Sequence, residues 1–227
     1  MTPAGQTLAA PVGVFGGTFD PVHNGHLRAA LEVLDSCGLA AMRLVPSGQP
    51  PHRNRPVAGP EERLRLLRVA TAGEPRFAVD ESELRRAGPS YTIDTLAVLR
   101  TALHPQPLCL VLGADAFLGL PDWHRWRELP DLAHLVVMHR PGAPLRAEGE
   151  LAQLLAARHS DDVGDLRRRS AGVVRLQPVT QLDISSTAIR TLVRDGRDPR
   201  YLVPDAVRDL LVSSSSYRHS VEVQVRA

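Results

Sequence analysis

A short apolar run, residues 12–15, leads directly into two adjacent glycines, Gly16 and Gly17, and then to His23 and His26. Because glycine has no Cβ, a strand that ends in such a turn lets the backbone approach a ligand closely. A helix that begins soon afterwards points its free N–H groups and the positive end of its dipole at the space above the strand, which suits phosphate. The two histidines are three residues apart and share one face of that helix. The segment therefore predicts a strand, a turn and a helix that bind phosphate, with both imidazoles as donors.

Chain length and charge narrow the class of protein. With 227 residues, the chain is long enough for one α/β domain with a full core. We expect this domain to span residues 1–212, and the serine run at 213–216 favours a flexible C-terminal tail over residues 213–227. The formal net charge of +2, without a long basic run, disfavours nucleic acid as a partner. The three arginines at 167–169 are typical of a solvated surface.

The cysteines and the hydropathy pattern exclude further classes. Cys37 and Cys109 give neither a disulfide framework nor metal-ligand spacing, and their apolar surroundings favour burial. No apolar run reaches the roughly 18 residues that a membrane-spanning helix needs. The first residues also lack the charged and apolar segments of a signal peptide. We therefore expect a cytoplasmic protein with no membrane partner.

Short apolar runs alternate with longer amphipathic ones along the chain, which is typical of strand–helix–strand units in a parallel sheet. The apolar runs predict strands at residues 12–15, 42–45, 77–79, 107–112, 135–138 and 173–176. Helices are predicted at 24–37, 61–72, 92–103, 148–158, 186–194 and 204–211, with a long proline-rich loop at 46–60. The expected fold class is α/β, with a parallel sheet, helices on both faces and a small C-terminal helical part.

Four predicted segments leave strands at the same edge of this sheet. They are the glycine turn, the loop after Val45, the turn after Leu112 and the segment after Leu176. Ligands of open parallel sheets bind beyond the carboxyl ends of the strands. We therefore expect the four segments to converge on one cleft.

Two of the later segments carry candidate anion-binding groups. The string PPHR at residues 50–53 combines stiff prolines with Arg53, a cation that can reach phosphate, although such a string is also typical of a surface loop. Ser90 and Tyr91 precede a predicted helix, and Thr92 is a candidate N-cap. The N–H groups that follow a cap suit an anion, and the alternative is an ordinary capped helix.

Two further segments add polar and aromatic groups. Asp115 can accept hydrogen bonds from ribose hydroxyls, and Trp123 offers a flat face on which an aromatic base can stack, although core packing also explains a tryptophan. Residues 185–186 are serines at a predicted helix start, and Arg190 follows one turn later. These hydroxyl, N–H and guanidinium groups suit phosphate, and the alternative is a serine cap without function.

In order and spacing, these segments resemble the bacterial nicotinate-nucleotide adenylyltransferases of the HxGH nucleotidylyltransferase superfamily. The similar strings are GGTFDPVHNGH at 16–26, PPHR at 50–53, SYTIDTL at 90–96, GADAF at 113–117, WHRW at 123–126, ISSTAIR at 184–190 and YLVP at 201–204. The resemblance covers residues 12–207 and implies a Rossmann-like nucleotidylyltransferase fold. It implies transfer of the adenylyl group of ATP to nicotinate mononucleotide, which gives nicotinate adenine dinucleotide (deamido-NAD) and pyrophosphate in NAD biosynthesis. Relatives commonly carry lysine where this chain has Arg53.

The resemblance also implies roles for individual residues. The implied catalytic residues are His23, His26, Arg190 and Arg53. The implied ATP site comprises Gly16, Gly17, Thr18, Phe19, His23, His26, Gly113, Asp115, Arg140, Ser185, Ser186 and Arg190. The implied nicotinate mononucleotide site comprises Gly17, Ser90, Tyr91, Thr92 and Trp123. Mg²⁺ is implied as an ion bound to ATP, and no protein ligand for a metal is expected, because the sequence offers no dedicated carboxylate cage.

Other hypotheses stay open. An adenylyltransferase for nicotinamide mononucleotide or phosphopantetheine is the nearest, although the pantetheine enzymes usually carry Thr-x-Gly-His in place of the string that runs from His23 to His26. An aminoacyl-tRNA synthetase also uses an HxGH motif, but this chain is short and has no KMSKS-like segment. A non-catalytic nucleotide sensor on the same fold is the alternative from another class. The expected partners are the small-molecule substrates, and the sequence leaves a homo-oligomer open.

Overall fold

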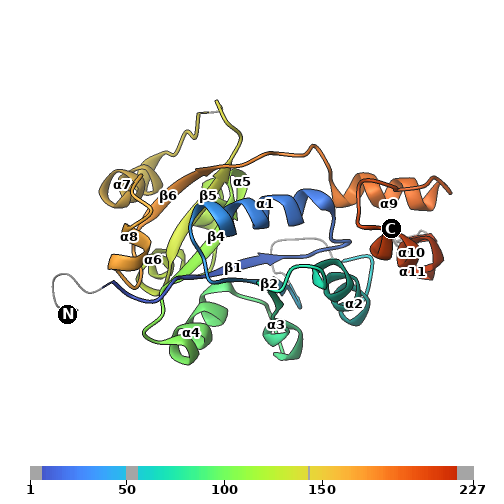
Figure 1. Ribbon diagram of the computed structural model, residues 1–227, viewed down its shortest axis with the longest axis horizontal. Coiled ribbons are helices and arrows are strands. Elements are labelled where there is room, and N and C mark those ends of the chain that lie inside the picture. Colours follow the sequence, from blue (N-terminus) through green and yellow to red (C-terminus); the bar gives the residue numbers. More distant parts are fainter. Residues whose placement is uncertain (1–6, 50–55, 143, 219–227) are drawn as a thin grey trace, which may run out of the picture.

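A computed structural model describes residues 7–49, 56–142 and 144–218, and its centre is a six-stranded parallel sheet (Figure 1). The strands lie in the order β3-β2-β1-β4-β5-β6. They are β1 (Val12–Gly17), β2 (Ala41–Pro46), β3 (Phe77–Val79), β4 (Leu108–Gly113), β5 (His134–His139) and β6 (Val174–Pro178). Each coincides with a predicted strand, and the predicted α/β fold is confirmed.

The strand order reverses direction between β1 and β4. From β1 the chain builds outward through β2 and β3, and it then returns to place β4, β5 and β6 on the other side of β1. Helix α1 (Asn24–Ser36) begins soon after the carboxyl end of β1. The carboxyl ends of the strands beside such a switch point are where open α/β sheets bind ligands.

Helices cover both faces of the sheet because successive side chains of a strand point to opposite faces. Phe15 of β1 and Val111 of β4 belong to the core beneath α1 and α2 (Pro60–Thr71). Val14 and Leu110, their neighbours along the same strands, belong to the core beneath α4 (Thr92–Leu103). Figure 1 shows α1 on one side of β1 and α4 on the other.

The long helices lie within two residues of their predicted ends. Besides α1, α2 and α4, they are α7 (Gly149–Arg158), α9 (Ser186–Arg194) and α10 (Asp205–Ser213). Short elements that we did not predict are α3 (Ser82–Arg85), α5 (Ala114–Leu118), α6 (Leu129–Leu132), α8 (Asp165–Arg168), α11 (Ser215–Arg218) and two 3₁₀ turns, Leu120–Asp122 and Trp126–Glu128. One cap is corrected: Tyr91 is the N-cap of α4, and Thr92 is its first helical residue.

The C-terminal segment differs from the expected flexible tail. Residue 213 ends α10, and the next residues form α11, in which Tyr217 is only 2% exposed. The Tyr217 hydroxyl donates to Oδ1 of Asp20, in the turn after β1, at 2.8 Å. A tail that begins at residue 213 is therefore wrong for residues 213–218, because an aromatic side chain buries itself there. Residues 219–227 lie outside the described part of the chain.

Cys37 and Cys109 are both buried free thiols, as predicted. In the parts of the chain that the structure describes, no helix is long and apolar enough to cross a membrane.

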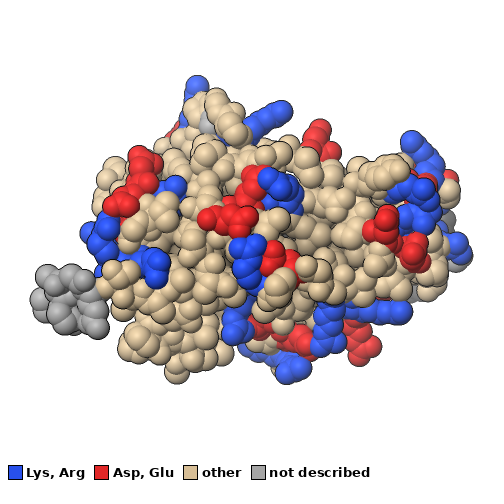
Figure 2. Space-filling model, in the orientation of Figure 1, with Lys and Arg blue, Asp and Glu red and all other residues tan. Residues whose placement is uncertain are grey.

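Acidic and basic side chains lie beside one another on the face shown in Figure 2, with broad uncharged areas between them.

Candidate active site

Two cavities lie at the carboxyl edge of the sheet, one on each face. We call the first the histidine cavity: it has a volume of about 380 Å³ and is lined by His23, His26, Arg140 and the segment 179–184 after β6. The second, the tryptophan cavity, has a volume of about 560 Å³ and is lined by residues of β1, β4, α4 and α5 together with Trp123. Phe15 lines the first and its neighbour Gly16 lines the second. The end of β1 therefore lies between the two cavities.

The two histidines open helix α1 and pack against each other. His23 is the N-cap and His26 is in the first turn, and their rings stack with centroids 3.7 Å apart and an interplanar angle of 27°. The backbone N–H of His23 donates to Nδ1 of His26 at 3.3 Å. Because this Nδ1 accepts, the ring proton of His26 is on Nε2, where it can be donated to an oxygen. A Cβ on Gly25 would lie only 3.0 Å from Nδ1 of His23, so the glycine leaves room for the pair.

Burial sets the charge of the first histidine. His23 is 6% exposed, and desolvation by burial lowers its pKa from 6.5 to about 4. The ring is therefore neutral at neutral pH, which removes the repulsion that two stacked imidazolium ions would suffer. Its buried Nδ1 has no hydrogen-bond partner among the described residues. An unpartnered buried nitrogen is costly and is a candidate contact for a ligand atom.

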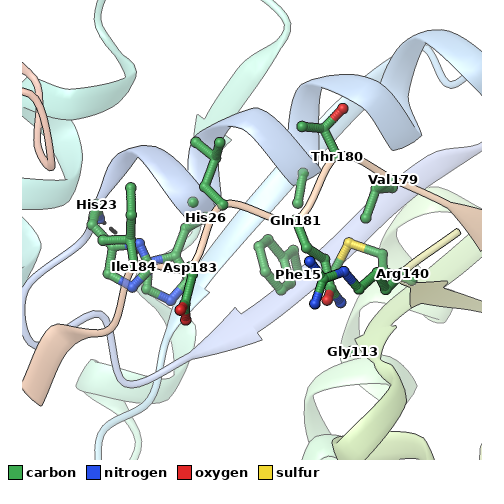
Figure 3. Close-up of a pocket in the computed structure, with 14 residues that line it drawn as sticks. Phe15, His23, His26, Gly113, Arg140, Val179, Thr180, Gln181, Asp183 and Ile184 are labelled. Carbon is green, nitrogen blue, oxygen red and sulfur yellow. Dashed lines mark hydrogen bonds between the residues drawn. The ribbon is translucent and has the colours of Figure 1, made fainter. Parts of the chain in front are cut away.

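The far end of the histidine cavity carries a cation. Arg140 follows β5 and is exposed, and Gly113 ends β4 beside it. In Figure 3, His23, His26 and Ile184 lie at one end of the lining residues, and Arg140 and Gly113 at the other. The segment after β6 is attached to α1 where the backbone N–H of Thr180 donates to Glu32 at 2.6 Å. The cavity thus has imidazole nitrogens at one end and a guanidinium at the other.

The tryptophan cavity contains the aromatic groups. Trp123 is half-buried in its wall, whereas Trp126 is 6% exposed and belongs to the core. Tyr91 lines the same cavity, and its ring lies 4.4 Å from that of His124. Thr92, at the start of the 12-residue helix α4, completes this wall. The cavity therefore offers a flat aromatic face close to the positive end of a helix dipole.

A buried carboxyl group supports the floor of this cavity. Glu83 is 8% exposed and accepts from the Thr95 hydroxyl at 2.7 Å, and desolvation raises its pKa above the usual range. Ser90 has a structural task as well: its Oγ accepts from the backbone N–H groups of Gly48 and Gln49 at 3.0 and 3.1 Å. Sequence reasoning named Ser90 but missed Glu83, which lies in a short helix with no periodic pattern.

Two of the other predicted phosphate ligands hold the turn after β1. Arg190 donates through Nη1 to the carbonyl oxygen of Asp20 at 2.7 Å and through Nη2 to Thr187 at 3.0 Å. Ser186 donates to the carbonyl oxygen of Pro21 at 2.9 Å, and Ser185 caps α9 by accepting from the backbone of residue 188 at 3.1 Å. Arg190 and Ser186 therefore lie against the turn that leads to His23, and none of these three residues lines either cavity.

The expected single cleft is corrected to two cavities. Gly16, Gly17, Thr18 and Asp115, which we expected on the ATP side, line the tryptophan cavity. Phe19 is buried, and its ring packs edge-on against Phe15 with centroids 5.9 Å apart and against His26 at 5.2 Å. The predicted Arg53 lies outside the described residues. Sequence alone could not separate the two cavities, because both lie at the same edge and differ only in face.

One buried cation near the site was not predicted. Arg63 of α2 is 1% exposed and donates to the carbonyl oxygens of Thr18 and Ser47 at 2.7 and 2.8 Å. Its position in the helix carries a signal, because it shares the apolar stripe of Leu66 and Leu67. A charged residue on an apolar helix face has to be paired inside the fold. Within the described residues, no group of three His, Cys, Asp or Glu side chains could hold a metal ion.

Comparisons with known proteins identify the family of the chain. The Cytidylyltransferase-like family matches residues 14–192. The chain is 48% identical over 211 residues to a protein of Aeromonas hydrophila named "Probable nicotinate-nucleotide adenylyltransferase", which covers 93% of this chain and 99% of the relative. It is 50% identical to the protein of the same name from Halorhodospira halophila, over 91% of this chain and 94% of the relative.

A solved structure shares the fold. It is the nicotinic acid mononucleotide adenylyltransferase of Plasmodium falciparum complexed with NaAD, with a TM-score of 0.69 at 12% identity, over 94% of this chain and 100% of that one. At this identity the likeness concerns the fold. The sequence identity to the bacterial relatives, over nearly their whole length, decides the family. The chain is therefore a nucleotidyltransferase and belongs to the nicotinate-nucleotide adenylyltransferase family.

Proposed function

We propose that the two cavities divide the substrates of this family's reaction, with ATP in the histidine cavity and the mononucleotide in the tryptophan cavity. The chain transfers the adenylyl group of ATP to nicotinate mononucleotide, which yields nicotinate adenine dinucleotide (deamido-NAD) and pyrophosphate in NAD biosynthesis. One observation carries the division: Phe15 and Gly16, neighbours in β1, line opposite cavities. Two ligands bound there would meet at the end of β1.

The chemistry requires alignment and charge neutralisation more than a base. An oxygen of the mononucleotide's 5′-phosphate forms a bond to the α-phosphorus of ATP, while the bond from that phosphorus to the bridging oxygen breaks and pyrophosphate takes the electron pair. A phosphate monoester dianion is already a nucleophile. The protein has to hold two anions in line and stabilise the charge that moves to the leaving group.

The histidine cavity suits the triphosphate of ATP. We assign Nε2 of His26 as a donor to a phosphate oxygen, and His23 as its neighbour in the same α- and β-phosphate region. Although burial lowers the pKa of His23 to about 4, an adjacent phosphate would raise it again, because an opposite charge favours the protonated ring. Arg140, at the other end of the histidine cavity, is assigned to the adenosine side. Arg190 is assigned to the leaving pyrophosphate, reached from its anchor on Asp20.

The tryptophan cavity suits a pyridine ring that bears a carboxylate. Trp123 is assigned to stack on the ring, and the start of α4 at Tyr91 and Thr92 is assigned to its carboxylate, because free N–H groups and a helix dipole favour an anion. An amide there would present an –NH₂ group to the same donors, which costs affinity. Asp115 lines this cavity, so we assign it to ribose hydroxyls on the mononucleotide side.

Mg²⁺ is proposed to enter with ATP, where it would neutralise part of the phosphate charge, since it binds through substrate phosphates in many such reactions. Arg53 is proposed to assist at the phosphates. We further propose that the protein works in the cytoplasm on these small molecules, and that nucleic acid and membranes are not its partners.

A coupled pyrophosphate assay tests the proposed reaction. The purified chain is given ATP and Mg²⁺ with nicotinate mononucleotide, nicotinamide mononucleotide or phosphopantetheine. We expect pyrophosphate release to require both substrates and to be fastest with nicotinate mononucleotide. Release that is faster with either competitor would assign another acceptor, and binding of ATP without pyrophosphate release from any pair would favour a nucleotide sensor.

A further inference from the structure

Two opposite charges are buried beside the turn that follows β1. Asp20 lies in that turn and is 5% exposed, and Arg63 of α2 is 1% exposed. Each uses backbone groups of neighbouring loops as partners. Asp20 accepts from the N–H groups of Val57 and Ala58 at 2.8 and 3.1 Å. Arg63 donates to the carbonyl oxygen of Ala58 at 3.3 Å. It also donates to the carbonyl oxygens of Thr18 in the turn and of Ser47, which directly follows β2.

These contacts make the pair a cross-link between loops. Hydrogen bonds to ionised groups are stronger than those between neutral groups, and burial strengthens them further because little water competes. The buried Asp20 carboxylate also lies close enough to Arg63 for its charge to raise the pKa of the guanidinium, which opposes the effect of burial. The turn after β1, the end of β2 and the residues before α2 are therefore held together by two side chains.

The C-terminal helix α11 supplies a third member of this cluster. The Tyr217 hydroxyl donates to Oδ1 of Asp20 at 2.8 Å, across 197 residues of sequence. Burial, and then the Asp20 charge, raise the pKa of Tyr217, so the hydroxyl stays protonated and remains a donor. Ser214, the residue before this helix, donates a hydrogen bond from its hydroxyl to Glu62 of α2. Tyr217 therefore contacts the turn from a helix whose start is held in place.

The same turn also orients the groups assigned to phosphate. The carbonyl oxygen of Asp20 accepts from Nη1 of Arg190, and the carbonyl of Pro21 accepts from Ser186. His23, two residues after Pro21, is the N-cap of α1. A shift of the Asp20 carboxylate would move its own carbonyl and the peptide units beside it. The contacts of that turn thus connect α11 to Arg190 and to the start of α1.

We propose that Tyr217 is a positioning residue for adenylyl transfer, which holds Asp20 through its hydroxyl and thereby sets the orientation of Arg190 and of the first turn of α1. Tyr217 does not touch substrate. Its contribution is to keep the turn in one arrangement while charge moves to the leaving group, where small misplacements are costly. The proposal rests on the assignment of Arg190 to the leaving pyrophosphate.

The Tyr217→Phe variant removes the hydroxyl and keeps the buried ring. We expect kcat to fall about ten-fold, because misaligned groups lose transition-state stabilisation at the leaving pyrophosphate while the mononucleotide still binds as before. The KM for nicotinate mononucleotide should stay within two-fold of wild type, since Tyr217 does not line the tryptophan cavity. Rates are measured at a temperature where circular dichroism shows each variant to be folded. Tyr201→Phe is the matched control, because that tyrosine is 81% exposed, and it should leave kcat unchanged.

A binding measurement separates this proposal from the proposed reaction. Calorimetric titration with magnesium pyrophosphate reports on the pyrophosphate site without turnover, and we expect the affinity of Tyr217→Phe to fall at least three-fold while that of Tyr201→Phe does not change. A kcat of Tyr217→Phe within two-fold of wild type, or a fall in kcat with a parallel rise in the KM for the mononucleotide, would overturn the positioning role. An inactive wild type would instead overturn the proposed reaction.

Discussion

The His23 backbone N–H donates to Nδ1 of His26, and the two imidazole rings stack with centroids 3.7 Å apart. This contact fixes the tautomer of His26 and leaves Nε2 as its donor. Burial keeps the His23 ring neutral, so the stack is stable at neutral pH. The arrangement makes His26 the clearest candidate in the structure for a phosphate donor.

Removal of this donor should slow the reaction without unfolding the protein. His26→Ala should lower kcat at least about 100-fold, because it removes a group that stabilises charge in the transition state. Steady-state rates of pyrophosphate release measure the effect, and circular dichroism checks the fold. His159→Ala is the control, since His159 is exposed and lies beside β6. A His26→Ala rate within three-fold of wild type would remove His26 from catalysis.

Acid should destabilise the protein through two buried histidines. Desolvation lowers the pKa of His23 and of His134 from 6.5 to about 4. Nδ1 of His134 accepts from the backbone of Val173 at 3.0 Å, so its ring must stay neutral to keep that bond. Above pH 6.5 both states of the protein carry neutral rings and stability is complete. As the pH falls from 6.5 towards 4, the unfolded chain binds protons that the folded chain does not, and stability is lost.

Urea unfolding at pH 7 and pH 5 measures this loss. Each histidine should cost about 2 kcal/mol of unfolding free energy between the two values, since one pKa unit corresponds to about 1.4 kcal/mol. His134→Gln should make the dependence on pH about half as steep, whatever its effect at pH 7. Equal unfolding free energies at pH 7 and pH 5 in the wild type would show that these rings titrate normally.

The two tryptophans should behave oppositely. Trp123→Ala should raise the KM for the mononucleotide about ten-fold with little change in stability, because stacking of a base on an aromatic ring contributes about 1–3 kcal/mol. Trp126→Ala should lower the unfolding free energy by about 3–5 kcal/mol, because its ring is in the core. Kinetics and urea unfolding on both variants give the comparison. A raised KM in Trp126→Ala together with a large loss of stability in Trp123→Ala would contradict both assignments.

Arg63 should be a major contributor to stability although it is charged. Arg63→Leu leaves three buried backbone carbonyl oxygens without their donor and removes the positive charge near the Asp20 carboxylate, so the unfolding free energy should fall by about 3 kcal/mol. Arg65→Leu, at an exposed position of the same helix, should change it by no more than about 0.5 kcal/mol. Similar values for the two variants would mean that the buried cross-link contributes nothing to stability.

The regular elements could be predicted because their patterns are local. The strand at Val12–Gly17 and the helix at Asn24–Ser36 are each set by apolar spacing and by the glycines between them. Helices of four or five residues, such as Ala114–Leu118, are too short for a period to emerge. Tyr217 carried no local signal either, because its partner Asp20 is 197 residues away.

The site could be predicted in part for the same reason. Residues named from the resemblance, such as His26, Arg140 and Trp123, do line cavities. Their sorting into two cavities depends on which face of the sheet each side chain occupies. A residue such as Arg63, which binds only backbone carbonyls, has no motif of its own. The apolar periodicity of its helix shows only that a charged residue lies on the buried face.

A crystal structure of the chain with nicotinate adenine dinucleotide would test the two-cavity arrangement. We expect the nicotinate ring to lie against Trp123 with its carboxylate at the start of α4. The adenosine should occupy the histidine cavity near Arg140, and the bridging phosphates should pass the end of β1 within reach of His26. A dinucleotide with both halves in one cavity, or with adenine stacked on Trp123, would contradict the assignment.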